Sequence, residues 1–485
     1  MASQFKEQAV RGVVWSLVER FGMHFLRFLL SIILARLLTP SDFGLIGMLV
    51  IFFEIANVFM DSGFGKAYVQ KKELQKEDAS TIFYFNLLVS IFLYALFFVS
   101  APWIADFYHQ PKLTEIIKVM GIVFIIDAMG LIQIAHLTRE VNFKLKSKIM
   151  LIATLAGGVL GVAAAYYGLG VWSLVIQNMS RAILKTAGFW ITSSWKPGAV
   201  FSVRSLKSMF GFGSWMLLTS LVQRLSQNLS LLVIGRVFPP AQVGFYSNAR
   251  QTQRIASEQM VGAVGAVAFP VFSKMQDNKE RLRNGVRQFL RHTLFLMTPL
   301  LVMLIVVAEP FVILFLKEKW APMVPYLQWL CVVGILYPLN MTNVQLLVAQ
   351  GKSNLSFRLS LVKNALRIIN IAIMYRFGVL YIVIGEVGVA LLSVYINSFY
   401  SGKFVNYSII KQLRDNWKLF LSAGLMFALG YFFLPVISGL IGKFVLGILI
   451  TGGFFLVFHY LFNREMLLEF LSSRNYFLKK KQQKE

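Results

Sequence analysis

The residues of this sequence that could do chemistry are charged side chains inside long apolar stretches. Arg20, His24 and Arg27 follow one another at intervals of four and three residues, so a helix places them on one face. Guanidinium groups offer a fork of N–H donors that suits phosphate. We therefore predict that this face binds an anionic substrate, with Arg20, His24 and Arg27 among the binding residues.

A second polar stripe recurs 200 residues further along the chain. Ser220, Arg224 and Gln227 have the same spacing as the first group. A polar face at the same place in two parts of a chain is typical of a cavity lining, because charge inside a membrane span costs on the order of 3 kcal/mol. Arg224 and Gln227 join the predicted substrate-binding set.

The stretches that follow each stripe are polar as well. Glu54, Asn57 and Asp61 lie in the first copy, and Arg250 and Arg254 lie in the second. We predict that Arg250 and Arg254 bind substrate, and that Glu54 and Asp61 take part in ion coupling or in charge pairing.

Two structural explanations compete with this interpretation. An arginine near a helix end can extend its head group to the membrane surface. Glu54 or Asp61 could also neutralise Arg20 or Arg27 as a purely structural pair. Three further intramembrane charges have no counterpart in the other copy and rank lower: Asp127, Arg367 and Glu386.

The elements that must position these groups are membrane helices. Of 485 residues, 57% are hydrophobic and 14% charged, and the mean hydropathy is +0.65, whereas soluble domains carry about 25% charged residues. About 20 mainly apolar residues span the hydrocarbon layer, and fourteen stretches qualify. They are 13–36, 43–63, 81–104, 114–137, 148–167, 170–190, 210–235, 244–271, 287–308, 323–349, 357–375, 379–400, 417–438 and 441–462.

The distribution of charge predicts the orientation. Of the Lys and Arg outside the spans, 26 fall on the side of the two termini and 5 on the other side, so the positive-inside rule places both termini in the cytoplasm. The net charge of +26 is then a topology signal, and we expect no nucleic-acid partner. The first apolar stretch is interrupted by Glu19 and Arg20, which predicts a retained span, not a cleaved signal peptide.

No pattern predicts an enzyme, a cofactor or a metal. The single cysteine, Cys331, cannot form an internal disulfide, and Gly351-Lys352-Ser353 lacks the leading glycine of a phosphate-binding loop because position 346 is leucine. With no ATP-binding motif, the expected driving force is a gradient of H⁺ or Na⁺, the membrane potential or substrate turnover.

An internal repeat divides the chain. Ala35–Pro40 aligns with Gly235–Pro240 at an offset of 200, and Trp15 aligns with Trp215. Repeats with an even number of spans are parallel, and transporters bind substrate between such repeats. We predict an all-α polytopic membrane protein of two parallel six-helix repeats plus two C-terminal helices. The predicted divisions are a six-helix bundle over 1–205, a second over 206–405, two extra helices over 406–463 and a basic cytoplasmic tail over 464–485.

The segment from Ser31 to Ile46, followed by Asp61-Ser62-Gly63-Phe64-Gly65, resembles the N-terminal signature of bacterial polysaccharide flippases. These belong to the polysaccharide transporter family of the multidrug/oligosaccharidyl-lipid/polysaccharide exporter superfamily, and the resemblance is closest to its colanic-acid-exporter-like branch. It extends through Gly244-Phe245-Tyr246-Ser247-Asn248-Ala249.

The resemblance implies a function. It implies alternating access and the flipping of an undecaprenyl-pyrophosphate-linked oligosaccharide across the bacterial cytoplasmic membrane for surface polysaccharide synthesis. Cavity arginines hold the pyrophosphate in related flippases, a role that Arg20, Arg27, Arg224, Arg250 and Arg254 match by position. The expected partners are this lipid-linked substrate, membrane lipids, H⁺ or Na⁺, and the glycan polymerase machinery.

Two alternatives remain open. A cation-coupled multidrug exporter needs an acidic cavity to attract organic cations, whereas the stripes here are rich in arginine. A membrane glycan polymerase or glycosyltransferase usually carries a large outer loop with catalytic groups, whereas the outer loops here are about a dozen residues long.

Overall fold

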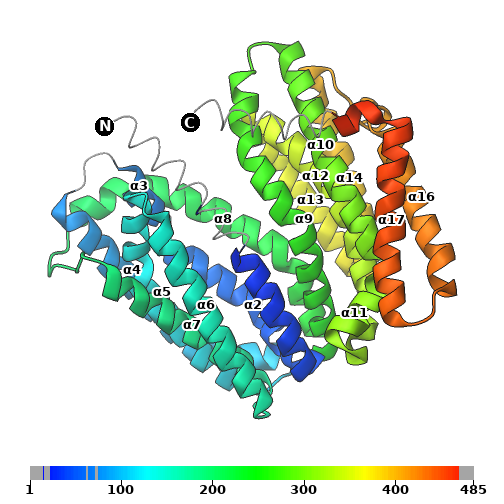
Figure 1. The fold of residues 1–485 in the computed structure, drawn as a ribbon. Coiled ribbons are helices and arrows are strands. Elements are labelled where there is room, and N and C mark those ends of the chain that lie inside the picture. Colours follow the sequence, from blue (N-terminus) through cyan, green and yellow to red (C-terminus); the bar gives the residue numbers. More distant parts are fainter. Residues whose placement is uncertain (1–14, 16–21, 62–63, 72–74, 469–485) are drawn as a thin grey trace. The chain divides into compact units, whose positions relative to one another are not determined.

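The computed structural model describes residues 15, 22–61, 64–71 and 75–468, and every regular element in these ranges is a helix (Figure 1). Within the described residues, each of the fourteen predicted apolar stretches overlaps one long helix. Within the described residues, eight helices are long and apolar enough to cross a membrane. The all-α, multi-pass prediction is therefore confirmed, and the count of fourteen spans stays a prediction.

The first half of the chain contains a helix over 22–37 and seven further helices up to residue 237. They are α2 (Pro40–Asp61), α3 (Phe64–Gln70), α4 (Lys76–Phe107), α5 (Lys112–Arg139), α6 (Phe143–Tyr166), α7 (Val171–Thr192) and α8 (Val203–Val237).

The second half continues with long helices joined by short turns. They are α9 (Pro240–Lys274), α10 (Lys279–Val306), α11 (Ala308–Leu316), η1 (Glu318–Met323), α12 (Val324–Ala349), α13 (Ser353–Met374), η2 (Tyr375–Phe377), α14 (Val379–Val405), α15 (Ile409–Asp415), α16 (Trp417–Phe433), η3 (Leu434–Val436) and α17 (Leu440–Phe462).

The helices form two compact units, an N-terminal unit over Met1–Gly244 and a C-terminal unit over Phe245–Glu485. Helix α8 belongs to the N-terminal unit because it packs against α2, α3 and α4. Helix α9 begins in the N-terminal unit and continues into the C-terminal one. The predicted division between 205 and 206 follows the sequence repeat and stays a prediction.

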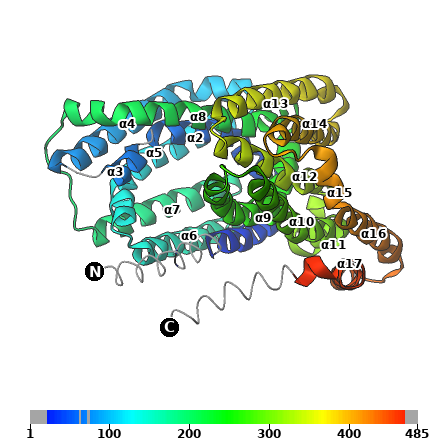
Figure 2. The ribbon, with the colours of Figure 1, turned by 90° about the horizontal axis from the view of Figure 1, so that it is seen from above.

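Small residues allow the helices of the N-terminal unit to approach closely. Gly157 and Gly161 of α6 lie against Arg181 and Gln177 of α7, and these two helices run side by side (Figure 2). A left-handed turn joins them, in which Gly170 has a φ of 53°, a conformation that glycine adopts without steric cost. Helix α7 is therefore held at a fixed register on α6.

The core of the C-terminal unit is a continuous apolar cluster. Leu290 and Leu294 of α10 pack with Met426 of α16 and Phe455 of α17 in this cluster. Burial of side chains of this size against other helices gives close packing. The last two long helices of the described chain are thus docked on α10.

Candidate functional site

Glu54 of α2 and Arg224 of α8 form an ion pair, with 2.9 Å between Glu54 Oε2 and Arg224 Nη1. The two side chains are 33% and 45% exposed, so the pair is open to its surroundings. The structure thus brings together two residues of the predicted set. Sequence spacing suggested Arg20 or Arg27 as partners for Glu54, and helix packing supplies Arg224 instead.

Arg27 is exposed on the helix over 22–37, and both this helix and Arg181 of α7 contact the glycine pair Gly157–Gly158 of α6. Neither side chain forms an ion pair within the described residues. In the part of the chain that the structure describes, Arg181 donates one side-chain hydrogen bond, from Nη2 to Oδ1 of Asn178 on its own helix, at 3.4 Å. The two guanidinium groups together make a local excess of positive charge.

The packing of three helices explains this juxtaposition. Leu30, three residues beyond Arg27, packs against Gly158 of α6, and Met23 Sδ accepts a hydrogen bond of 3.5 Å from Thr154 Oγ1 of the same helix. Gly157 in turn lies against the side chain of Arg181. Because α6 contacts both neighbours through one turn of small residues, it sets Arg27 beside Arg181.

One turn further along α7, Lys185 forms an ion pair of 2.8 Å with Asp127 of α5. The side chains are 20% and 28% exposed. Thr186 supports the contact by donating a hydrogen bond of 2.9 Å to the backbone carbonyl of Ile126. Asp127 therefore pairs with Lys185, whereas Arg181 has no carboxylate partner among the described residues.

Arg181 and Lys185 were not predicted as functional residues. The signal was available, because they stand four residues apart inside a predicted span, as Arg20 and His24 do. They have no basic counterparts 200 residues further along the chain, where Tyr381 and Gly385 stand, so the internal repeat does not point to them.

In the C-terminal unit, Arg250 lies 6.0 Å from the ring centroid of Tyr246, a distance at which a cation is attracted to the ring face. The hydroxyl of Tyr246 donates a hydrogen bond of 3.1 Å to Oε1 of Glu386. The sequence ranks Glu386 low as a functional residue, but Tyr246 connects its carboxylate to Arg250. Arg254 is half-buried one turn beyond Arg250.

The remaining predicted residues are placed as follows. His24 and Gln227 are half-buried on the helix over 22–37 and on α8. Arg20 and the side chain of Asp61 lie outside the described part of the chain. Among the residues that the structure describes, no group of three His, Cys, Asp or Glu could hold a metal ion.

The arrangement can bind an anion. A guanidinium in a medium of low dielectric constant attracts an anion more strongly than it does in water. Two neighbouring guanidinium groups without carboxylate partners would both be neutralised by one pyrophosphate. Arg27 and Arg181 form such a pair in the N-terminal unit.

The sequence is similar to known proteins over most of its length. Residues 33–325 match the family described as polysaccharide biosynthesis protein. The chain is 29% identical to the teichuronic acid biosynthesis protein TuaB of Bacillus subtilis (strain 168), over 72% of this chain and 73% of that protein. It is 27% identical to the lipopolysaccharide biosynthesis protein WzxC of Escherichia coli (strain K12), over 74% of each.

The fold is also found among solved structures. The lipid II flippase MurJ in an inward closed conformation superposes with a TM-score of 0.73, covering 94% of this chain and all of the other, at 14% sequence identity. The two proteins therefore share a transporter fold.

Proposed function

Because this chain belongs to the polysaccharide biosynthesis protein family, we propose that it flips an undecaprenyl-pyrophosphate-linked oligosaccharide across the cytoplasmic membrane. The names of its relatives support a role in the supply of glycan units for surface polymers. The fold shared with a lipid II flippase supports movement of a lipid-linked sugar. In this proposal the protein is a transporter and not an enzyme.

The observation that carries the proposal is the pair of cations Arg27 and Arg181. Neither has a carboxylate partner among the described residues, and an anion that lies between them is attracted by both positive charges. A pyrophosphate fits because its oxygens can accept several guanidinium donors at once. An organic cation, the substrate class of a multidrug exporter, would be repelled by the same pair.

The proposed cycle is alternating access. The two predicted repeats, 1–205 and 206–405, alternate between a state open to the cytoplasm and a state open to the outside, with both termini cytoplasmic. Arg224, Arg250 and Arg254 are the further candidates for contact with the headgroup, Arg224 in exchange for its pair with Glu54. Glu54 and Asp61 are the candidates for coupling to H⁺ or Na⁺, and glycan polymerase machinery is the expected consumer of the product.

The test is translocation in liposomes. The purified protein is reconstituted with a fluorescent polyprenyl-pyrophosphate oligosaccharide, and outward movement is followed by quenching from the outside. We expect Arg27→Gln and Arg181→Gln each to lower the initial rate at least tenfold, because a charge-assisted hydrogen bond contributes about 1.5–3 kcal/mol. Arg204→Gln, at an exposed position near the start of α8, is the matched control and should transport normally.

Two results would refute the proposal. If the unmodified protein moves no lipid-linked oligosaccharide under any ion gradient, the assigned function is wrong. If it transports but both arginine variants keep the full rate, the assignment of the pyrophosphate to Arg27 and Arg181 is wrong while the transport function stands.

A further inference from the structure

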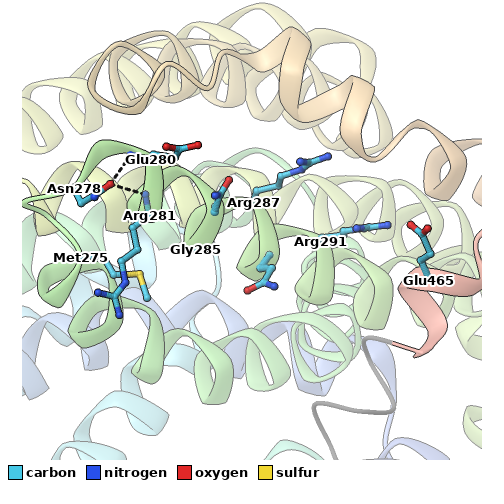
Figure 3. Close-up of a pocket in the computed structure, with 10 residues that line it drawn as sticks. Met275, Asn278, Glu280, Arg281, Gly285, Arg287, Arg291 and Glu465 are labelled. Atoms are coloured by element: carbon cyan, nitrogen blue, oxygen red, sulfur yellow. Dashed lines mark hydrogen bonds between the residues drawn. The ribbon is translucent and has the colours of Figure 1, made fainter.

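The C-terminal unit holds a polar pocket that the proposed transport site does not use. It lies at the start of α10 and has a volume of about 780 Å³ (Figure 3). Its wall comes from the turn between α9 and α10, from α10 as far as Arg291, and from the segment after α17. All of its lining residues belong to the same compact unit.

The helical repeat of α10 explains why this wall is polar. Leu282, Val286 and Leu290 recur every four residues and are buried in the core of the unit. The neighbouring face of α10 lines the pocket. Its residues are spaced at intervals of three, four and three, and they are Arg281, Asn284, Gln288 and Arg291. One face of α10 thus anchors the helix while the other presents guanidinium and amide groups.

The start of α10 is fixed by a side-chain cap. Oδ1 of Asn278 accepts hydrogen bonds from the backbone N–H groups of Glu280 and Arg281, at 3.1 and 3.0 Å. Such a cap satisfies N–H groups that have no partner inside the helix. Because the first turn is held in this way, Arg281 projects from an ordered backbone at one end of the pocket (Figure 3).

Arg287 connects the pocket to α15 through an ion pair. Its Nε lies 2.8 Å from Oδ2 of Asp415 at the end of α15. A guanidinium has five N–H donors, so this contact leaves donors for another anion. Arg291 points towards Glu465, which lies on the segment after α17 (Figure 3), so cationic groups line the pocket along its length.

The lining suits a phosphodiester attached to hydroxyl groups. Arg281, Arg287 and Arg291 supply donors for phosphate oxygens. Asn284 and Gln288 supply amides that both donate to and accept from hydroxyls. Glu280 and Glu465 partly offset the positive charge, which disfavours a compact polyanion and favours a headgroup with one negative charge.

The position of the pocket along α10 gives the source of such a headgroup. Helix α10 is long and apolar enough to span a membrane, and its arginines all precede the uncharged run from Thr293 to Val306. The pocket therefore lies at the polar end of this apolar run, the end at which we expect the helix to leave the hydrocarbon layer. Basic pockets at this level between membrane helices bind anionic lipid headgroups.

We propose that this pocket binds the phosphodiester headgroup of an anionic phospholipid such as phosphatidylglycerol. Because the wall includes α10 and the segment after α17, the bound headgroup also holds the end of α17 on α10. The site is distinct from the proposed substrate site, so it can be tested whether or not the protein transports an oligosaccharide.

The test measures lipid binding to the full chain in detergent by native mass spectrometry and by thermal unfolding. Phosphatidylglycerol should raise the unfolding temperature, because a ligand that binds only the folded state stabilises it. Asn284→Glu places a carboxylate in the pocket without removing an observed contact and should weaken binding about tenfold. Asn284→Gln is the matched neutral control and should bind as the unmodified protein does.

A second pair of variants tests the arginines. Arg281→Gln should weaken binding about tenfold. Arg283→Gln changes the same helix, but Arg283 does not line the pocket and contacts Glu280 at 3.7 Å, so this variant should bind normally. Circular dichroism and size-exclusion profiles establish that each variant is folded before its binding is compared.

Three outcomes would overturn the proposal. The first is equal phosphatidylglycerol binding by Asn284→Glu and Asn284→Gln. The second is equal stabilisation by inorganic phosphate and by phosphatidylglycerol, which would show that the pocket binds a soluble anion. The third is displacement of the lipid by polyprenyl pyrophosphate at a lower concentration than phosphatidylglycerol itself requires, which would assign the pocket to the transport substrate.

Discussion

Gly44 and Gly244 lie one turn into α2 and α9, and each packs against the backbone carbonyl of the proline that begins the other helix. Gly44 contacts Pro240 and Gly244 contacts Pro40, so the arrangement is reciprocal between positions that stand 200 residues apart. Only a residue without a Cβ allows two backbones to approach so closely. The repeat-related residues at the starts of α2 and α9 therefore contact each other.

Alanine at either glycine should destabilise the protein. A methyl group at Gly44 or Gly244 would overlap a carbonyl oxygen that belongs to a helix backbone and cannot rotate away. We expect Gly44→Ala and Gly244→Ala each to lower the free energy of unfolding by about 1–3 kcal/mol, the usual cost of overpacking. Thermal unfolding in detergent, followed by intrinsic fluorescence, measures the loss.

Gly388→Ala is the matched control for this prediction. Gly388 is also helical, but nothing lies within 4 Å of the position that a Cβ would take. Since alanine favours helix over glycine by about 1 kcal/mol, this variant should unfold at the same temperature or a higher one. Equal effects of Gly44→Ala and Gly388→Ala would contradict the close approach.

Exchanging the charges of Glu54 and Arg224 should show whether this ion pair has a structural role or a role in transport. Glu54→Gln and Arg224→Gln each break the ion pair. The double variant Glu54→Arg with Arg224→Glu restores opposite charges at the same two positions. If Arg224 contacts the headgroup, the double variant should regain the unfolding temperature of the unmodified protein but not its transport rate. Recovery of transport in the liposome assay would instead assign the pair a purely structural role.

Sequence predicts the helices of this protein well because hydropathy is a local property. Every predicted apolar stretch is helical in the described chain, since a backbone in lipid must satisfy its hydrogen bonds within the segment. The ends differ more: α10 begins at Lys279, eight residues before the predicted start, because its first turns are polar and extend beyond the apolar run.

The charge partners could not be predicted in the same way. Glu54 pairs with Arg224, 170 residues away in the sequence, because α8 packs on α2. Spacing along one helix shows which residues share a face, but it does not show which helix that face meets. Arg181 illustrates the same limit, because its proximity to Arg27 depends on the glycines of α6 that lie between the two helices.

Alkaline pH should weaken the C-terminal unit through Tyr407. Burial raises the pKa of the Tyr407 phenol, and the carboxylate of Asp415 raises it further. In the unfolded chain the phenol ionises near its ordinary pKa of about 10, whereas in the folded protein it stays neutral to higher pH. Stability is therefore fully present below about pH 10 and falls as the pH rises above that value.

Comparison of unfolding temperatures at about pH 9 and pH 11 tests this effect. Tyr407→Phe should show a smaller fall than the unmodified protein, because it has no phenol to ionise. Tyr166→Phe is the control, since Tyr166 is 80% exposed, and should fall as the unmodified protein does. An identical fall in all three proteins would exclude Tyr407 as the source.

Removal of one partner of the Lys185–Asp127 pair should cost more stability than removal of both. Asp127→Asn leaves the Lys185 ammonium, which is 20% exposed, without its carboxylate and one turn from the positive charge of Arg181. We expect a loss of about 2 kcal/mol, below the range for fully buried pairs because both side chains retain some access to solvent. Lys185→Met with Asp127→Asn removes the ammonium as well and should recover most of this loss. A double-mutant cycle on the unfolding free energies gives the coupling directly. A value near zero would mean that apolar packing and the hydrogen bonds of Thr186 and Trp190 to backbone carbonyls of α5 hold the two helices together without help from the ion pair.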